Sequence, residues 1–300
     1  MTSDPWTTTA PPAPTRIGPT TFVWGQCTFI MGILNVTPDS FSGDGLLAGP
    51  DPVGHAVATA RRMVAEGADL LDVGGESTRP RHASVDTAEE IARIVPVIAA
   101  VAAALPATPI SVDTSKRAVA EAALAAGGHL LNDIWGTGPE SGEMATVAAE
   151  AGVPLIVMHN RAEARYEGDV VTELLADLSA ALDRAIAAGV PATDLIVDPG
   201  IGFGKTVDHN VTVLRHLDAL KTLGRPVLLG TSRKSTLGRI LDLPVEERLE
   251  ATLATTALGI AAGVDIVRVH DVGPNVRAAR VSDAIVRGHW RADAGDGARP

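Results

Sequence analysis

The stretch AEGADLLDVG (65–74) decides the fold, because the same pattern returns later in the chain. An Ala-rich segment of helical character ends at a glycine, a short turn follows, and an apolar strand begins. The stretch AAGVDIVRV (261–269) repeats this order of helix end, glycine, turn and strand. Each copy therefore predicts one helix followed by one buried strand.

The chain contains eight short apolar runs with helical segments between them. The runs cover residues 28–36, 70–75, 109–114, 130–134, 154–159, 195–200, 226–232 and 265–270. Most are nearly continuous in Val, Ile and Leu, as expected for a parallel sheet buried on both faces. The helical segments 52–67 and 176–189 both end in glycine, a usual helix C-cap. Eight alternating units without a long linker predict an α/β fold of the (β/α)8 TIM-barrel type, with an open doubly wound sheet as the alternative.

Composition and charge indicate a globular protein and argue against some classes of binding partner. The 300 residues are 46% hydrophobic and 20% charged. A formal charge of -11 argues against non-specific binding to nucleic acid or to anionic membranes. The single cysteine, Cys27, excludes an internal disulfide and is interpreted as a small apolar residue at a strand start. We expect a cytoplasmic protein without a membrane span, because no long uncharged apolar run is present.

The two ends of the chain differ from its centre. Residues 1–20 are rich in Thr and Pro and lack the basic start and apolar run of a signal peptide. The sequence therefore predicts a flexible N-terminal tail over 1–20, one barrel domain over 21–292, and a flexible C-terminal tail over 293–300.

Polar side chains gather where the predicted strands end. These strand-end residues are Asn35, Asp72, Asp113, Asn132, Asp133, His159, Asp198, Ser232, Arg233, Lys234, Arg268 and His270. Active sites of such barrels lie at the C-terminal ends of the strands. Burying so many polar groups without partners is costly, so we expect a polar ligand there. Asp72 and Asp133 are interpreted as structural.

Eight motifs at these strand ends carry a family resemblance. In order they are MGILNVTPDSFSGDG, DVGGESTRP, SVDTSK, NDI, VMH, DPGIGFGK, GTSRKS and RVHDV. Together they resemble dihydropteroate synthase over about residues 28–290. The resemblance implies a transferase that joins 6-hydroxymethyl-7,8-dihydropterin diphosphate to p-aminobenzoate, with Mg2+ assisting and sulfonamides competing. It also implies a homodimer that forms through barrel helices near the C-terminal end.

The resemblance implies a pterin site built on carboxylates. Asp198 would accept two parallel hydrogen bonds from the amino group and ring N–H of the pterin. Asp113 and Asn132 would complete the ring contacts, Met158 would lie against a ring face, and Lys234 would reach the carbonyl side. The alternatives are a turn for Asp198, a helix cap for Asp113 and a backbone-bonded amide for Asn132.

The resemblance assigns a second group of residues to the diphosphate and the metal. Arg268 and His270 are two residues apart on one strand, so they point to the same side. Both would bind the leaving diphosphate, and the amide oxygen of Asn35 would ligate Mg2+. The alternatives are an Arg-His pair in a structural network and an Asn that bonds to its own turn.

The loops after the first two strands are expected to close over the site and to form the p-aminobenzoate pocket. By resemblance the residues of this pocket are Thr37, Pro38, Phe41, Thr78, Arg79, Pro80, Phe203 and Ser235. The implied catalytic residues are Asp39, Arg79, Lys234, Arg268 and His270. Asp39 either pairs with Arg79 on closure or stabilises a cationic intermediate, and the sequence leaves both roles open.

Two further features limit the alternatives. GIGFGK (200–205) lacks the spacing of a nucleotide-binding P-loop, so its glycines are interpreted as letting the backbone pass near a ligand. The sequence shows no Ser-His or Cys-His arrangement for an activated nucleophile. The rival functions are a pterin-dependent methyltransferase barrel and a non-catalytic pterin-binding paralogue.

Overall fold

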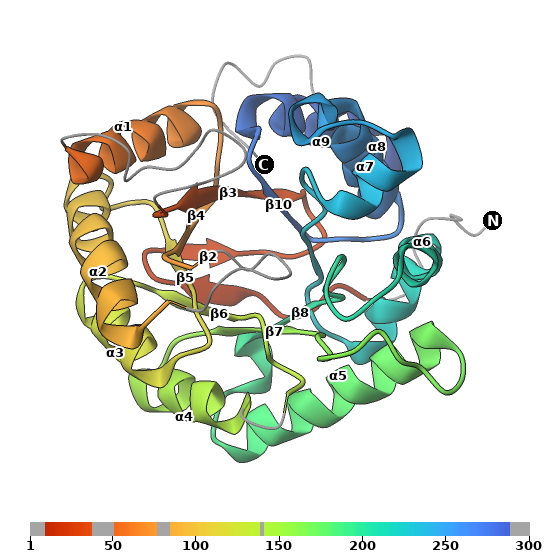
Figure 1. Cartoon of the computed structure of the whole chain (residues 1–300), viewed down its shortest axis with the longest axis horizontal. Coiled ribbons are helices and arrows are strands. Elements are labelled where there is room, and N and C mark those ends of the chain that lie inside the picture. The colour runs from red at the N-terminus through yellow and green to blue at the C-terminus, as the bar shows by residue number, and fades with distance from the viewer. Residues whose placement is uncertain (1–9, 38–50, 77–84, 139–140, 289–300) are drawn as a thin grey trace.

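Eight parallel strands form a barrel inside a ring of helices (Figure 1) in the computed structural model, which describes residues 10–37, 51–76, 85–138 and 141–288. The barrel strands are β3 (Phe29–Asn35), β4 (Leu70–Gly74), β5 (Ile110–Asp113), β6 (Leu130–Asp133), β7 (Leu155–Met158), β8 (Leu195–Asp198), β9 (Leu228–Leu229) and β10 (Ile266–Val269). Their order is β8-β7-β6-β5-β4-β3-β10-β9, and a parallel bridge between Val197 and Val227 links the two ends. The TIM-barrel prediction is therefore confirmed.

The helices of the described chain follow the strands in alternation. The α-helices are α1 (Pro52–Ala65), α2 (Thr87–Ala104), α3 (Arg117–Ala125), α4 (Ser141–Ala151), α5 (Val170–Ala187), α6 (Val207–Arg215), α7 (Ser235–Leu241), α8 (Leu249–Ala261) and α9 (Val272–Arg287). The 3-10 helices are η1 (Ala192–Asp194), η2 (Leu217–Leu223) and η3 (Val245–Glu247). Within the described ranges, none of these helices has the length and apolar character needed to cross a membrane.

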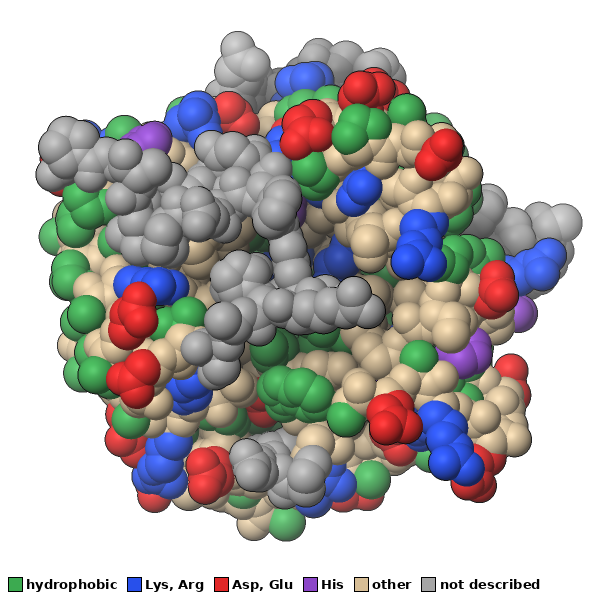
Figure 2. All heavy atoms as spheres, in the orientation of Figure 1, with side chains coloured by type: hydrophobic (Ala, Val, Ile, Leu, Met, Phe, Trp, Pro, Cys, Tyr) green, Lys and Arg blue, Asp and Glu red, His purple; other side chains and the backbone are tan. Residues whose placement is uncertain are grey.

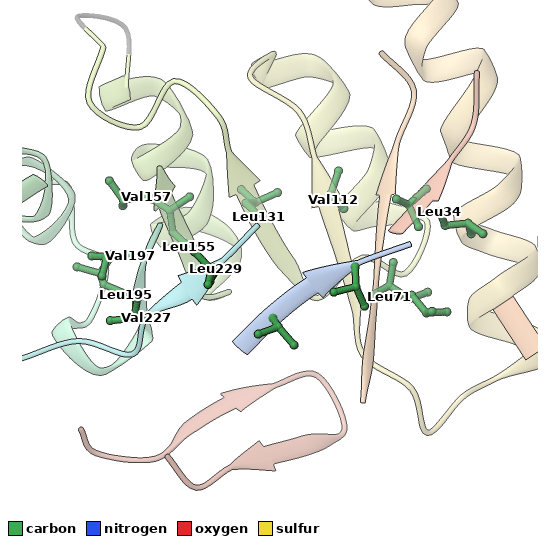
Figure 3. Packing of buried hydrophobic residues seen from close by; sticks show 14 of the residues in the cluster. Leu34, Leu71, Val112, Leu131, Leu155, Val157, Leu195, Val197, Val227 and Leu229 are labelled. Carbon is green, nitrogen blue, oxygen red and sulfur yellow. The ribbon is translucent and has the colours of Figure 1, made fainter. Parts of the chain in front are cut away.

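Each barrel strand buries one row of side chains under the helices and a second row in the barrel lumen. Figure 3 shows members of the outer row, among them Leu71, Leu131 and Val197, which belong to one hydrophobic cluster with the helices. The inner row is apolar near the N-terminal ends of the strands, where Leu70 and Ile156 are completely buried. Nearer the C-terminal ends the inner row becomes polar, and this change places the candidate site.

The repeated Gly-x-Asp pattern of the opening stretch has a structural reason. Gly67 and Gly263 take φ values of +105° and +89°, which L side chains rarely adopt. Two residues later, Asp69 Oδ2 accepts a hydrogen bond from Ile30 N at 2.6 Å, and Asp265 Oδ2 accepts one from Val227 N at 2.9 Å. Each aspartate therefore ties the start of its own strand to the start of a neighbouring strand.

The boundary predicted at residue 21 is wrong, because an antiparallel hairpin precedes the barrel. Its strands are β1 (Thr15–Ile17) and β2 (Thr20–Phe22). Ile17, Phe22 and Trp24 share a hydrophobic cluster with the apolar lumen residues, so the hairpin closes the N-terminal end of the barrel. Trp24 Nε1 donates to Thr15 Oγ1 at 3.0 Å, which gives the buried indole its polar partner. The predicted C-terminal tail, 293–300, lies outside the described residues.

We expect Trp24→Ala to lower the free energy of unfolding by about 3–5 kcal/mol, the usual cost of removing a large core aromatic. Trp24 is only 2% exposed and contacts Phe22 and Phe29. Urea denaturation followed by circular dichroism measures the change. The matched control is Trp135→Ala, because Trp135 is 40% exposed. Equal denaturation midpoints for both variants would contradict the assignment of the hairpin to the core.

Candidate active site

The polar ends of the strands enclose one pocket at the mouth of the barrel. The space within and above it measures about 320 Å³, which includes open solvent at the mouth. The lining residues are Asp113, Asn132, Ile134, Met158, Asp198, Gly200, Ile201, Phe203, Gly230, Lys234 and Arg268. The residues assigned to the pterin by resemblance all belong to this lining. Around this pocket, the face of the molecule in Figure 2 carries acidic and basic side chains interspersed over its periphery.

Asp198 ends β8 and presents its carboxylate inside the pocket. It is 5% exposed, and its Oδ1 accepts a hydrogen bond from Gly200 N at 2.7 Å. Asp198 therefore does organise a turn, as one interpretation expected. A carboxylate oxygen that accepts one hydrogen bond can still accept another, so the same group can also bind a ligand. Burial raises the pKa of Asp198, while the Gly200 N–H and Lys234 oppose that rise. A ligand with paired N–H donors would supply the hydrogen bonds that water supplies elsewhere.

Lys234 faces Asp198 from the start of α7. Its Nζ lies 3.9 Å from the ring centroid of Phe203, a cation-π contact. Burial lowers the pKa of Lys234 to about 8, while Asp198 opposes this shift and Arg268 adds to it. The ammonium is therefore charged at neutral pH and close to losing its proton. It offers hydrogen-bond donors beside an acceptor carboxylate and an aromatic face.

Arg268 crosses the lumen from β10 and bridges two carboxylates. Its Nε donates to Asp72 Oδ2 and its Nη2 donates to Asp113 Oδ2, both at 2.6 Å. Asn132 Nδ2 donates to the same Oδ2 of Asp72 at 3.1 Å. Burial raises the pKa of Asp113 to about 7, although Arg268 opposes the shift. The guanidinium of Arg268 therefore lies between the carboxylates of Asp72 and Asp113. Asp113, Asn132 and Arg268 also line the pocket.

The imidazole of His270 is in hydrogen-bond contact with a serine, Ser232. Its Nδ1 lies 2.9 Å from Ser232 Oγ, and its backbone N–H donates to the same oxygen at 3.1 Å. Ser232 and His270 therefore form a Ser-His contact in space that their positions in the sequence do not indicate. The pair is not built as an activated nucleophile, because Ser232 is 5% exposed and its oxygen is held by the backbone of His270. With Ser232 as donor to Nδ1, the imidazole carries its proton on Nε2.

The remaining described candidates flank the pocket. Asn35 is the last residue of β3 and pairs in register with Gly74. Alternation along the strand from buried Ile33 puts Asn35 on the lumen side, and it is half-buried. Thr37 is 5% exposed just beyond β3, and Ser235 is the first residue of α7. Of the loop residues, Pro38, Asp39, Phe41, Thr78, Arg79 and Pro80 lie outside the described residues.

Lys205 fixes the glycine-rich loop that carries part of the pocket wall. Its Nζ lies 2.8 Å from His159 Nδ1, 3.1 Å from Gly200 O and 3.2 Å from Phe203 O. Burial lowers the pKa of Lys205 to about 7 and that of His159 to about 3. His159 is thus neutral, with Nδ1 accepting from Lys205 and Nε2 donating to Asp177 at 3.1 Å. Through these contacts Lys205 fixes the backbone of the glycine-rich loop.

Other side chains hold the same loop from its flanks. Gly200 needs its φ of +64°, and a Cβ there would lie 1.9 Å from His159 O, so only glycine fits. Gly202 N donates to Asn210 Oδ1 at 2.8 Å, and Tyr166 Oη donates to Gly204 O at 3.0 Å. Side-chain hydrogen bonds therefore hold this loop in place.

Sequence reasoning missed two residues that organise the site. Asp72 was assigned a structural role, yet it lies at the centre of the lumen cluster. A charged residue inside the apolar run LLDVGG (70–75) was the available signal. Lys205 follows GIGFG without any motif that marks it as buried. Asp133 does act locally, because its Oδ1 accepts from Trp135 N at 2.9 Å and burial raises its pKa to about 6.

Comparisons with known proteins agree with this geometry. The model of the family described as pterin binding enzyme matches residues 31–270. A dihydropteroate synthase from Clostridium beijerinckii is 48% identical over 273 residues, which cover 91% of this chain and 99% of that protein.

Solved structures give the same result. A dihydropteroate synthase from Clostridium difficile, determined in the presence of pteroic acid, superposes with a TM-score of 0.82 at 46% identity and covers 88% of this chain and 98% of its own. The Yersinia pestis dihydropteroate synthase in complex with a sulfonamide drug gives a TM-score of 0.85 at 37% identity, over 92% of this chain and 100% of its own. The chain described here belongs to the pterin-binding enzyme family, as one of its dihydropteroate synthases.

Proposed function

We propose that the pocket between Asp198, Asn132 and Lys234 binds the pterin ring of the substrate. The observation that carries this proposal is the buried Asp198 carboxylate, which faces a buried lysine across a pocket of about 320 Å³. A pterin presents an amino group and a ring N–H on one edge and a carbonyl beside them. Asp198 accepts from the donor edge, and Lys234 donates to the carbonyl side.

The reaction follows from the family membership. Dihydropteroate synthases join 6-hydroxymethyl-7,8-dihydropterin diphosphate to p-aminobenzoate, and this chain carries out that transfer. The bond from the pterin methylene carbon to the diphosphate oxygen breaks, and a bond from that carbon to the aniline nitrogen forms. Diphosphate leaves with the electron pair, and the aniline nitrogen loses one proton. We propose a dissociative course, in which Asp198 and Asp113 stabilise positive charge on the pterin.

The leaving diphosphate is assigned to Arg268 and His270. Arg268 Nε and Nη2 are held by carboxylates, so a diphosphate would compete with Asp113 for the terminal nitrogens. His270 would contribute its Nε2–H, since Nδ1 faces Ser232. Both groups would stabilise negative charge that grows on the leaving oxygen.

The donor groups fit a loosely held Mg2+ better than a resident metal cage. Across the described residues, no group of three or more His, Cys, Asp or Glu side chains could hold a metal ion. The amide of Asn35 is a hard oxygen ligand on the lumen side of β3, of the kind that Mg2+ accepts beside water and phosphate oxygens. When bound there, Mg2+ would offset the charge of the diphosphate.

The p-aminobenzoate site is placed beside the pterin pocket. Phe203 supplies an aromatic wall, and Ser235 at the start of α7 is the assigned contact for the carboxylate. The other assigned residues are Thr37 and the loop residues outside the described ranges. Sulfonamides are proposed to compete at this site, which is supported by the sulfonamide complex of the Yersinia pestis relative.

The first test measures dihydropteroate formation from both substrates, with Mg2+ and with a chelator. We expect Asp198→Asn to lower kcat/KM for the pterin substrate by about 100-fold or more, because a hydrogen bond to a charged acceptor is lost and one donor faces another. Metal removal should lower the rate of the wild type as well.

The control for this test is Asp194→Asn, a partly exposed aspartate that precedes β8 and should leave both rates unchanged. Product formation that survives in Asp198→Asn would contradict the pterin anchor. Rates that ignore the chelator would contradict the metal assignment and leave the anchor intact.

A second prediction concerns pH. Burial lowers the pKa of Lys234 to about 8, so its positive charge is present below pH 8 and is lost above it. If the ammonium binds the pterin, the affinity for 6-hydroxymethylpterin should fall as the pH rises through about 8. Lys234→Arg should move this decline to higher pH, because a guanidinium stays protonated. A decline at the same pH in both proteins would assign it to the ligand and contradict the role of Lys234.

We further propose a homodimer through the outer surfaces of α8 and α9. Leu258 on α8 is 69% exposed, and Val281 and Ile285 on α9 are 62% and 71% exposed. Val281 and Ile285 are four residues apart, so they share one face of the helix. A second copy of the chain would cover these apolar side chains and agrees with the dimer that the resemblance implies.

Ile285→Asp should convert the dimer into a monomer, because it places a charge in an apolar contact. Light scattering coupled to size-exclusion chromatography gives the mass directly. Ile186→Asp is the matched control, since Ile186 is 41% exposed on α5, across the barrel from α9 (Figure 1). A monomeric wild type, or equal masses for wild type and Ile285→Asp, would contradict this interface.

A further inference from the structure

We propose that Asp72 is a positioning residue of the pterin pocket, which sets the direction of the Asn132 amide and of the Arg268 guanidinium. The inference rests on the proposed pterin site and adds a residue that touches neither substrate. Asp72 is 0% exposed and lies behind the two side chains that line the pocket. Its single oxygen Oδ2 accepts from both of them.

The contacts of Asp72 pass through the lumen and not along the sheet. Asp72 lies on β4, whereas Asn132 lies on β6 and Arg268 on β10. In the sheet, β5 separates β4 from β6, and β3 separates β4 from β10. The carboxylate therefore fixes the relative position of side chains from strands that share no backbone hydrogen bonds.

The chemistry of a carboxylate decides which way the amide of Asn132 faces. An ionised carboxylate only accepts hydrogen bonds, so the NH2 group of Asn132 must point at Asp72. The amide oxygen then points away from Asp72 and presents an acceptor on the pocket side. The amino group and ring N–H of a pterin are donors, so this orientation is the productive one. An amide without that partner could present its NH2 group to the ligand instead.

The same carboxylate divides the tasks of Arg268. Asp72 holds Nε, which leaves the terminal nitrogens on the pocket side. Nη2 donates to Asp113, and this contact is the one that a ligand can replace without releasing the side chain. Arg268 can thus turn toward an anion while its Nε stays anchored. Preorganised donors of this kind lose little orientation freedom when the ligand arrives.

An unused atom supports a positioning role over a purely stabilising one. Among the described residues, Asp72 Oδ1 and Ser111 Oγ are buried without a hydrogen-bond partner, although Asp72 and Ser111 are paired in register on β4 and β5. Asp72 Oδ1 thus adds no protein hydrogen bond that would stabilise the fold. Its two good contacts both end on residues that line the pocket.

The experiment compares Asp72→Val with Asp72→Asn. Asp72→Val removes the acceptor, so the affinity for 6-hydroxymethylpterin, measured by calorimetry, should fall about 10- to 100-fold. Asp72→Asn keeps an oxygen that Arg268 Nε can hold in place, so its affinity should stay within about threefold of the wild type. In steady-state assays Asp72→Val should raise KM for the pterin substrate and leave KM for p-aminobenzoate nearly unchanged.

The control is Asp69→Val, which removes an aspartate just before the start of β4, where it accepts a hydrogen bond from Ile30 N. It should lower the melting temperature without changing pterin affinity. If Asp72→Val does not fold, Asp72→Ala replaces it, because it forces no larger side chain into the lumen. Equal losses in the valine and asparagine variants, or no loss in either, would overturn the inference.

Asp198→Asn measured in parallel separates the two levels of the argument. If Asp198→Asn abolishes pterin binding while Asp72→Val does not weaken it, the positioning role fails and the pterin site stands. If Asp198→Asn also binds the pterin like the wild type, the pterin site itself is misplaced, and the positioning role fails with it.

Discussion

The closed parallel barrel is the constraint on which the rest of this structure depends. Closure forces every second side chain of each strand into a narrow lumen, where it meets side chains from the opposite wall. The chain uses the two ends of that lumen differently. Apolar residues and the β1–β2 hairpin fill the N-terminal end, and acids, amides and cations fill the C-terminal end. The apolar N-terminal end of the lumen therefore supports the polar C-terminal end, where the strands position the side chains of the site.

The buried charges in the mouth of the barrel explain its readiness for a polar ligand. Asp72, Asp113 and Asp198 lie near Arg268 and Lys234, so three buried acids meet two buried cations. Burial raises the pKa of Asp113 to about 7 and lowers that of Lys234 to about 8, while the carboxylates raise the pKa of Arg268. Arg268 is held by two carboxylate partners, whereas the shifts of Asp113 and Lys234 mark buried groups that are short of solvation. A pterin with donors and acceptors on its edges would relieve that shortage.

The sequence predicted the strands and their polar ends because both depend on local patterns. Runs such as LIVDPG (195–200) are short, rich in β-branched residues and followed by Pro-Gly, which favours a buried strand, and the barrel rule then locates the site. The hairpin escaped because Thr and Pro dominate residues 1–20, and the burial of Ile17 follows from tertiary contacts. The role of Asp72 escaped for a similar reason, since its partners lie on β6 and β10.

The glycine-rich loop after β8, which forms one wall of the pocket, differs from an ordinary loop because a buried lysine, Lys205, holds it. An ammonium that binds two carbonyls and an imidazole is costly to bury, and burial lowers the pKa of Lys205 to about 7. Loops usually avoid that cost by staying in water. Here the ammonium binds the carbonyl groups of Gly200 and Phe203, which both follow Asp198, and so fixes the aromatic wall relative to the anchor. Burial of Lys205 costs stability but fixes the geometry of this loop. The buried hydrogen bonds of Asp72 fix the geometry of the lumen in the same way.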